Sequence, residues 1–338
     1  MMAPRRSGHG YGHSAVCDGA FASIETQVSL AYIILFTLVF FFIFAALFFV
    51  RKRSGRTGKA LVSTSYISAV VMMLISNILE TVSFILISCN TTNYFNYLNM
   101  VIASNVFYAL ATWCLLFVTV YILNALLTRY LHLGRGQQTS PVVKVIPLAV
   151  VTVMLPLICA GMRLWTYITI TSDAERSGGG DMMYATSRML SLTVRVIYLI
   201  GVCAGAVLVG LSVMKMRARR VAGGGLIVWV AVLFFSMLLW NILSLIRAAE
   251  ILSGITWNWG AEMAQAYLQG AFQALAFVAL MGIAKHPSWE SMEDAVQQEY
   301  SPVGQQQATT TTTTYEGAQL DHFQSPAVYE APVYVHAK

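Results

Sequence analysis

Residues 261–284 read AEMAQAYLQGAFQALAFVALMGIA, an apolar run interrupted by one regular set of polar side chains. The run is long enough to cross a bilayer as a helix, which takes ~20 residues. Its polar residues recur at spacings of three, four and four, so in a helix they project from one face; they are Glu262, Gln265, Gln269 and Gln273. Because lipid cannot satisfy an amide or a carboxylate, we expect other helices of the chain to cover this face.

The remaining sequence supplies such helices. Of the 338 residues, 57% are hydrophobic and 11% are charged, against roughly 45–50% and about 25% in a typical soluble domain. The pattern predicts an all-α, polytopic membrane protein with a seven-helix transmembrane domain over 28–285. The predicted spans are about 28–50, 60–88, 97–128, 142–162, 187–214, 224–250 and 261–284.

Three further segments flank this domain. Residues 1–27 form a short polar N-terminal tail. The segment 286–300 has the pattern of an amphipathic helix lying along the membrane, with Trp289 on its apolar face. The tail 301–338 is rich in Pro, Gln and Thr, which predicts disorder.

The basic residues of the loops predict the orientation. The first, third and fifth loops carry five, about three and four Lys or Arg, and the second and sixth carry none. The positive-inside rule therefore predicts that the odd loops are cytoplasmic, with the N-terminus outside and the C-terminus inside. We expect a multi-pass protein of the plasma membrane, in contact with membrane lipid.

Two features of the second loop agree with this orientation. The sequence Asn90-Thr91-Thr92 is a glycosylation sequon, which is used only on the lumenal side. Cys17 and Cys89 would both lie outside, where thiols are oxidised, so they can form a disulfide or remain free.

Polar residues within the predicted spans are candidates for a ligand pocket, because intramembrane polar groups are costly and face the protein interior or water. Glu80 and Arg195 each lie about eight residues from the outer surface, roughly 12 Å deep, so that a pair between them is allowed. The alternative is that these residues hydrogen-bond one another and only hold the helices together. The candidates are Asn77, Glu80, Asn105, Arg195, Arg247, Glu262, Gln265, Gln269 and Gln273.

Several function classes are disfavoured. Seven-helix zinc hydrolases need intramembrane histidines, and none of the six histidines lies in a predicted span. A retinal protein needs a lysine midway along the last helix, whereas Lys285 lies at its end. The net charge of +6 is explained by the cytoplasmic loops rather than by nucleic-acid binding. We therefore expect no enzyme activity, no metal and no cofactor.

Thr128-Arg129-Tyr130, at the inner end of the third span, resembles the Asp/Glu-Arg-Tyr motif of rhodopsin-like G-protein-coupled receptors, with threonine in place of the acid. The seven spans, the basic inner loops and the Thr-rich tail are similar to such receptors across the whole chain. The receptor Asn-Pro-x-x-Tyr motif is missing from the last span, and no proline lies near Trp240. The chain also resembles fungal orphan seven-helix membrane proteins, a group that includes the lipid-transporter-like RTA1 family.

The resemblance implies a receptor-like protein that senses a ligand in its outer half and signals to a cytoplasmic partner, for example a heterotrimeric G protein. Basic and aromatic residues at the inner helix ends are the coupling candidates; they are Arg129, Tyr130, Arg217, Arg219 and Arg220. The alternative is a transporter of small molecules or lipids lined by the same polar residues.

Overall fold

The computed structural model describes residues 20–133, 180–218, 224–253 and 258–287, together with the isolated residues 17, 149, 152, 153, 156, 159 and 289. Within these ranges, six helices of 25 to 33 residues are long and apolar enough to cross a membrane. The chain therefore has the architecture of an all-helical membrane protein. The predicted fourth span, 142–162, lies almost wholly outside the described residues, and the count of seven stays a prediction.

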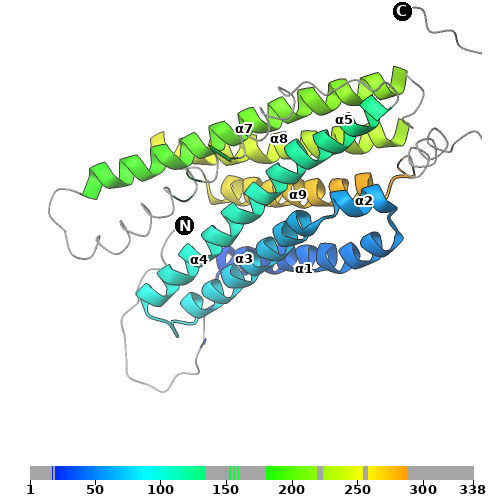
Figure 1. Ribbon diagram of the computed structural model, residues 1–338. Helices are drawn as coiled ribbons and strands as arrows, with labels where there is room; N and C mark the ends of the chain where they lie inside the picture. The colour runs from blue at the N-terminus through cyan, green and yellow to red at the C-terminus, as the bar shows by residue number, and fades with distance from the viewer. Residues whose placement is uncertain are drawn as a thin grey trace, which may run out of the picture. The chain divides into compact units, whose positions relative to one another are not determined.

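The long helices lie beside one another (Figure 1). Their bounds are α1 Ile24–Arg53, α2 Arg56–Leu61, α3 Thr64–Ser88, α4 Tyr94–Leu116, η1 Phe117–Ile122, α5 Leu123–Leu133, α7 Gly180–Ala218, α8 Gly224–Ser253 and α9 Trp259–Ala284. Each long helix packs on the next along the chain, and α9 also packs on α1. The described helices thus form a ring that the contact between α1 and α9 closes.

The outer faces of these helices carry large apolar side chains. Phe49 on α1 is 73% exposed and Met214 on α7 is 70% exposed. Soluble proteins rarely expose apolar surface on this scale. Because side chains of the same kind are exposed on α3, α8 and α9 as well, lipid is the solvent that suits this surface.

The structure corrects the predicted start of two spans. The first begins at Ile24 rather than 28, because the hydroxyl of Ser23 accepts a hydrogen bond from the Thr26 N–H and caps the helix. The second begins at Thr64 rather than 60. The preceding residues form the separate helix α2. Val62 and Ser63 separate α2 from α3, because their backbone conformations are not helical.

Two further spans are longer than predicted. The third extends over Tyr94–Leu133 and contains the π-helical segment η1 near its middle. The fifth begins at Gly180, inside the stretch expected to be a loop. A π-helical segment widens one turn locally and is found frequently at functional sites, so η1 is considered again below.

Glycines allow three helices to approach closely around η1. A Cβ at Gly205 of α7 would lie 2.8 Å from Val120 Cγ2 of η1 and 3.3 Å from Phe234 Cε1 of α8. Gly205 belongs to the Gly201-x-x-x-Gly205 spacing, which therefore serves packing within the chain.

The segment after α9 turns back onto the bundle. Trp289 is buried, and its Nε1–H donates to the carbonyl of Ile283 over 2.6 Å. His286 lies against Gly225 of α8, and burial lowers the pKa of its imidazole. The indole of Trp289 is thus covered by the protein, while the predicted amphipathic helix over 286–300 lies mostly outside the described residues and stays a prediction.

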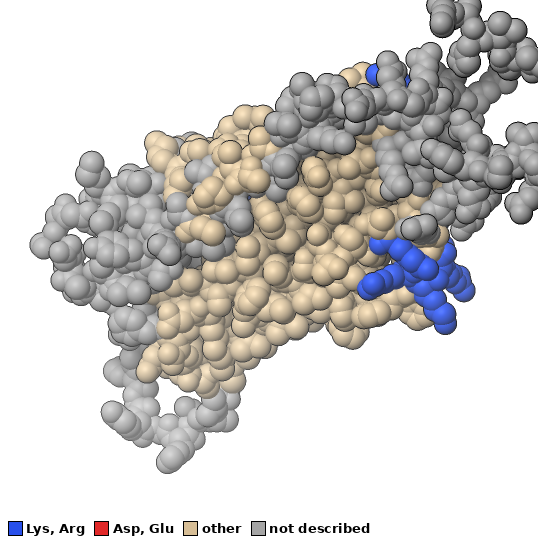
Figure 2. Space-filling view, viewed as in Figure 1, with Lys and Arg blue, Asp and Glu red and all other residues tan. Residues whose placement is uncertain are grey.

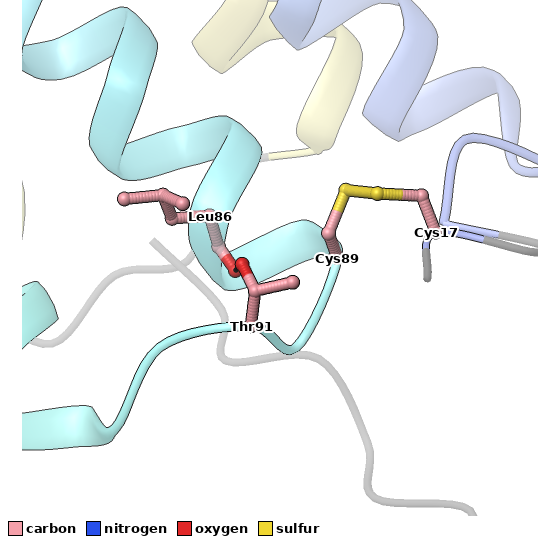
Figure 3. The surroundings of a disulfide bond; sticks show 4 residues. All are labelled: Cys17, Leu86, Cys89 and Thr91. Atoms are coloured by element: carbon pink, nitrogen blue, oxygen red, sulfur yellow. Dashed lines mark hydrogen bonds between the residues drawn. A yellow bond between two sulfur atoms is a disulfide. The ribbon is translucent and has the colours of Figure 1, made fainter. Parts of the chain in front are cut away.

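A disulfide joins Cys17 to Cys89, which confirms the sequence-based pairing (Figure 3). It ties the N-terminal segment to the end of α3, next to Thr91, whose hydroxyl donates to the Leu86 carbonyl. Its two cysteines are 72 residues apart in sequence. In the loop-entropy model, closing a loop of this length stabilises the fold by about 4 kcal/mol.

Basic side chains gather at the other end of the bundle. The last turn of α1 carries Arg51, Lys52 and Arg53, and Figure 2 shows Lys and Arg side chains clustered at one end of an otherwise uncharged surface. The last turn of α7 adds Lys215 and Arg217. Glu25 and Glu262 lie in the first turns of α1 and α9, at the opposite end. The two ends of the bundle therefore differ in charge.

We predict that Gly205→Ala lowers the free energy of unfolding by about 1–3 kcal/mol, because the added methyl group overlaps Val120 and forces the packing apart. Gly210→Ala on the same helix is the matched control, since nothing lies within 4 Å of a Cβ there. Thermal unfolding of the two purified variants in the same detergent measures the difference. Equal midpoints for both variants would refute close packing at η1.

Candidate functional site

The polar stripe of α9 faces the interior of the bundle, as the spacing predicts. Gln265 is buried, and its Nε2 donates to the Leu243 carbonyl of α8 over 2.9 Å. Gln273 is buried too, and its Nε2 lies 3.2 Å from the Met73 sulfur of α3. Gln269, between them, is close to Tyr108 of α4. Consecutive members of the stripe thus contact three different helices, while Glu262 lies half-buried in the first turn of α9.

Three charged side chains come together from α3, α7 and α8. Glu80 of α3 interacts electrostatically with Arg247 of α8. Arg247 also interacts electrostatically with Arg195 of α7, on which Tyr108 acts as well. The basic residue that acts on Glu80 is thus Arg247, and not Arg195, with which the sequence allowed a pair. All three side chains are half-buried.

Aromatic side chains complete the group, and sequence reasoning missed them. The Trp240 ring packs edge-on against Tyr108, with centroids 6.5 Å apart, and against Tyr198, with centroids 5.7 Å apart. The Trp240 Nε1–H donates to the Tyr108 hydroxyl over 3.2 Å. The sequence signal that could have revealed these residues is the presence of Trp and Tyr inside apolar spans. Their N–H and O–H groups usually form hydrogen bonds when buried.

We call this group the polar cluster; it consists of Glu80, Tyr108, Arg195, Tyr198, Trp240, Arg247 and Gln269. It draws on α3, α4, α7, α8 and α9. Glu80 lies eight residues before the end of α3, which is the end that carries the disulfide. The cluster therefore occupies the half of the bundle away from the basic end.

Two atoms of the polar cluster are buried without a hydrogen-bond partner. They are the hydroxyl oxygen of Tyr198 and the Oε1 of Gln269. Most buried polar groups in proteins are hydrogen-bonded, so each exception calls for a specific explanation. Tyr198 also interacts electrostatically with Tyr108, so that both unpartnered atoms belong to groups beside Tyr108.

Two of the predicted pocket residues do not join the polar cluster through their side chains. The amide of Asn77 donates to the Met73 carbonyl of its own helix over 2.8 Å. The amide of Asn105 donates to the Val101 carbonyl over 2.9 Å, and its side chain is exposed. Intrahelical bonds of this kind satisfy an amide without a second helix, which the polar pattern alone does not reveal.

Other polar residues hold helices together, as the alternative interpretation expects. Ser76 of α3 and Ser104 of α4 each donate to the other's backbone carbonyl, over 2.9 and 3.0 Å. Thr37 of α1 lies 3.0 Å from Thr81 of α3, hydroxyl to hydroxyl. Some polar residues thus fit the pocket interpretation, and others fit the interpretation that they hold the helices together.

Below Gln273 the interior is mainly apolar. Phe277 and Leu280 of α9 are fully buried. Leu123 of α5 and Leu233 of α8 are fully buried as well. Thr119 and Thr128 are buried there as well, but their hydroxyl groups donate to carbonyls of their own helical segment. Asn124 and Ser236 are buried as well, and the Ser236 hydroxyl donates to the Val232 carbonyl of its own helix. The described buried side chains of this half are thus mostly, though not all, apolar.

Among the coupling candidates, the structure describes only the side chain of Arg217. Arg217 is exposed in the last turn of α7. Arg129 and Tyr130 belong to α5, but their side chains are outside the description, and so are Arg219 and Arg220. In the described ranges, no group of three His, Cys, Asp or Glu side chains could hold a metal ion.

No family model, curated protein or solved structure matches this chain. The interpretation of the polar cluster therefore depends on its own chemistry.

We predict that Gln265→Leu lowers stability by about 0.6 kcal/mol, the average worth of an interhelical hydrogen bond in a membrane protein. Asn105→Leu is the matched control, because its amide is exposed and bonded within its own helix, so an apolar replacement costs nothing there. Unfolding of both variants in the same detergent measures the difference. A loss at Asn105 equal to that at Gln265 would contradict this assignment.

Proposed function

We propose that this chain is a receptor-like membrane protein that binds a ligand at the polar cluster and signals to a cytoplasmic partner. In this proposal the N-terminus is outside and the C-terminus inside. The disulfide supports that orientation, because disulfides persist in the oxidising space outside the cytoplasm. The basic last turns of α1 and α7, at the opposite end, are typical of cytoplasmic helix ends.

The observation that carries the functional proposal is the position of the polar cluster. Five helices supply its charged and hydrogen-bonding groups in one half of the bundle, and the buried side chains described in the other half are mostly apolar and carry no charge. A transporter needs a polar or open path through both halves in turn. A site restricted to one half suits ligand binding better than passage.

The segment η1 offers a route from the cluster to the cytoplasmic end. It follows α4, which carries Tyr108, and it precedes α5, which carries Arg129. Gly205 of α7 and Phe234 of α8 pack at η1. A ligand that favours a regular α-helical turn here would rotate α5 relative to α4, and such a two-state element is what a signalling change requires.

The orientation has a direct test. We predict that Asn90, which is exposed, carries N-linked glycan when the full chain is made in eukaryotic cells. Thr92→Ala should abolish the glycan and leave expression intact, and endoglycosidase digestion should then no longer change electrophoretic mobility. Thr91→Ala leaves the sequon complete and is the control. A chain that stays unglycosylated in the secretory pathway would oppose an N-terminus outside.

The signalling proposal is tested by coupling. We predict that the purified protein captures a heterotrimeric G protein or another cytoplasmic signalling partner, and that removing the basic charges of Arg217, Arg219 and Arg220 weakens capture. Glu80→Gln should alter the signalling output in cells without reducing capture, since Glu80 lies in the opposite half. If no output responds to either change and Glu80→Gln instead abolishes the flux of a solute or lipid, the transporter alternative replaces the receptor proposal.

A further inference from the structure

The face of α7 that turns toward the polar cluster carries an arginine and a tyrosine one turn apart. Arg195 and Tyr198 are three residues apart, and residues at this spacing are neighbours on a helix surface. Tyr198 is only 6% exposed, and its hydroxyl has no partner. Asn241 of α8 donates to the Arg195 carbonyl over 3.2 Å, which fixes this turn of α7 against α8.

The charges of the polar cluster do not balance. Arg195 and Arg247 are cationic, and no described carboxylate is among the groups that act on Arg195. Glu80 acts on Arg247, whereas the groups that act on Arg195 are Tyr108 and Arg247 itself. A buried or half-buried cation without an anion is costly in a membrane. One negative charge next to Arg195 would offset that cost.

We propose that Arg195 and Tyr198 bind the carboxylate of a small organic monoanion. This inference rests on the ligand site of the proposed function and names its ligand class. The guanidinium group can donate two parallel hydrogen bonds to a carboxylate, and the unpartnered Tyr198 O–H is a further donor on the same face. The Trp240 ring, packed against Tyr198, provides an apolar wall for the organic part of the ligand.

The unpartnered Oε1 of Gln269 adds a requirement. It accepts hydrogen bonds and cannot donate them, so it does not bind the carboxylate. It matches a hydroxyl or N–H elsewhere on the ligand. The Tyr198 hydroxyl can donate to the carboxylate, whereas the Gln269 Oε1 can only accept. An acid that also carries a donor satisfies both.

Charge and depth distinguish a carboxylate from a phosphate. Arg195 is one cation on which no described carboxylate acts, which matches a monoanion, whereas a phosphate dianion would leave a negative charge unpaired. Glu80, which interacts with Arg247 of the same cluster, is eight residues from the end of α3, roughly 12 Å along the helix. A lipid headgroup phosphate would have to leave the interface to reach this level.

The experiment uses the full-length protein in detergent and follows thermal unfolding and tryptophan fluorescence. The probes are benzoate and 4-hydroxybenzoate, with benzamide and 4-hydroxybenzamide as neutral isosteres. We expect the two acids, but not the amides, to raise the unfolding midpoint, and 4-hydroxybenzoate to bind more tightly than benzoate. Inorganic phosphate and vesicles that contain phosphatidic acid are separate arms, and we expect neither to compete with benzoate.

Tyr198→Phe provides the decisive variant. Removing an unpartnered hydroxyl should leave the ligand-free protein at least as stable as the wild type, while benzoate binding weakens by about tenfold, the usual worth of a hydrogen bond to a charged group. Tyr66→Phe is the matched control. Its hydroxyl donates to the Phe277 carbonyl over 2.8 Å, so this variant should lose stability and keep its response to benzoate.

Arg195→Gln should abolish the response to both acids, and Arg53→Gln at the basic end should leave it unchanged, because Arg53 is exposed in the last turn of α1. If Arg195→Gln does not fold, the comparison of benzoate binding by Tyr198→Phe and Tyr66→Phe still tests the proposal. The proposal is overturned if neither acid shifts the midpoint, if the amides shift it equally, if phosphate or phosphatidic acid displaces benzoate, or if Tyr198→Phe binds benzoate like the wild type. These readouts need no signalling partner, so a failure of the receptor proposal alone leaves them unaffected.

Discussion

Lipid offers no hydrogen bonds to the polar side chains of α9, and the arrangement of the bundle follows from that constraint. Gln265 reaches a carbonyl of α8, Gln273 reaches a sulfur of α3, and Gln269 faces Tyr108 of α4. A helix with these three contacts has to lie between its neighbours rather than at the edge. The contact of α9 with α1, which is far away in sequence, then closes the ring.

Close approach reinforces the same position for α9. Gly270 lies against the ring of Phe36 on α1, and Gly282 lies against Trp229 on α8. At the end of the helix, Gly58 of α2 packs on the Ala284 carbonyl. Polar contacts and the Gly270 contact thus fix α9 in the half that holds the polar cluster, whereas the contacts at Gly282 and Ala284 and buried apolar side chains fix it in the basic half.

Apolar length and spacing were sufficient to predict the six spans that the structure describes, because a bilayer sets the length of a helix directly. The same spacing predicted that the stripe of α9 faces inward, and the positions of Cys17 and Cys89 allowed, without requiring, the disulfide that the structure contains. Partner identity was predicted less well. Arg247 rather than Arg195 lies near Glu80, and Asn105 bonds within its own helix, because a one-dimensional pattern gives the depth of a residue but not the rotation of its helix. The aromatic part of the polar cluster was missed since Trp240, Tyr108 and Tyr198 resemble ordinary apolar residues in a membrane span.

The two unpartnered atoms of the polar cluster are easier to explain by a ligand than by packing. If the cluster served only to join helices, natural substitutions such as phenylalanine for Tyr198 would remove a buried hydroxyl without losing any contact, and stability would not oppose them. The Ser76 and Ser104 hydroxyl groups show what a packing role looks like, since each reaches a carbonyl of the other helix. Arg195 differs from them as well, because burial takes its charged guanidinium group out of water and a second arginine, Arg247, acts on it unfavourably. Groups that are costly without a ligand and complementary to an anion are typical of a binding site. Here they lie next to Trp240 of α8, and the same helix packs near the π-helical segment through Phe234.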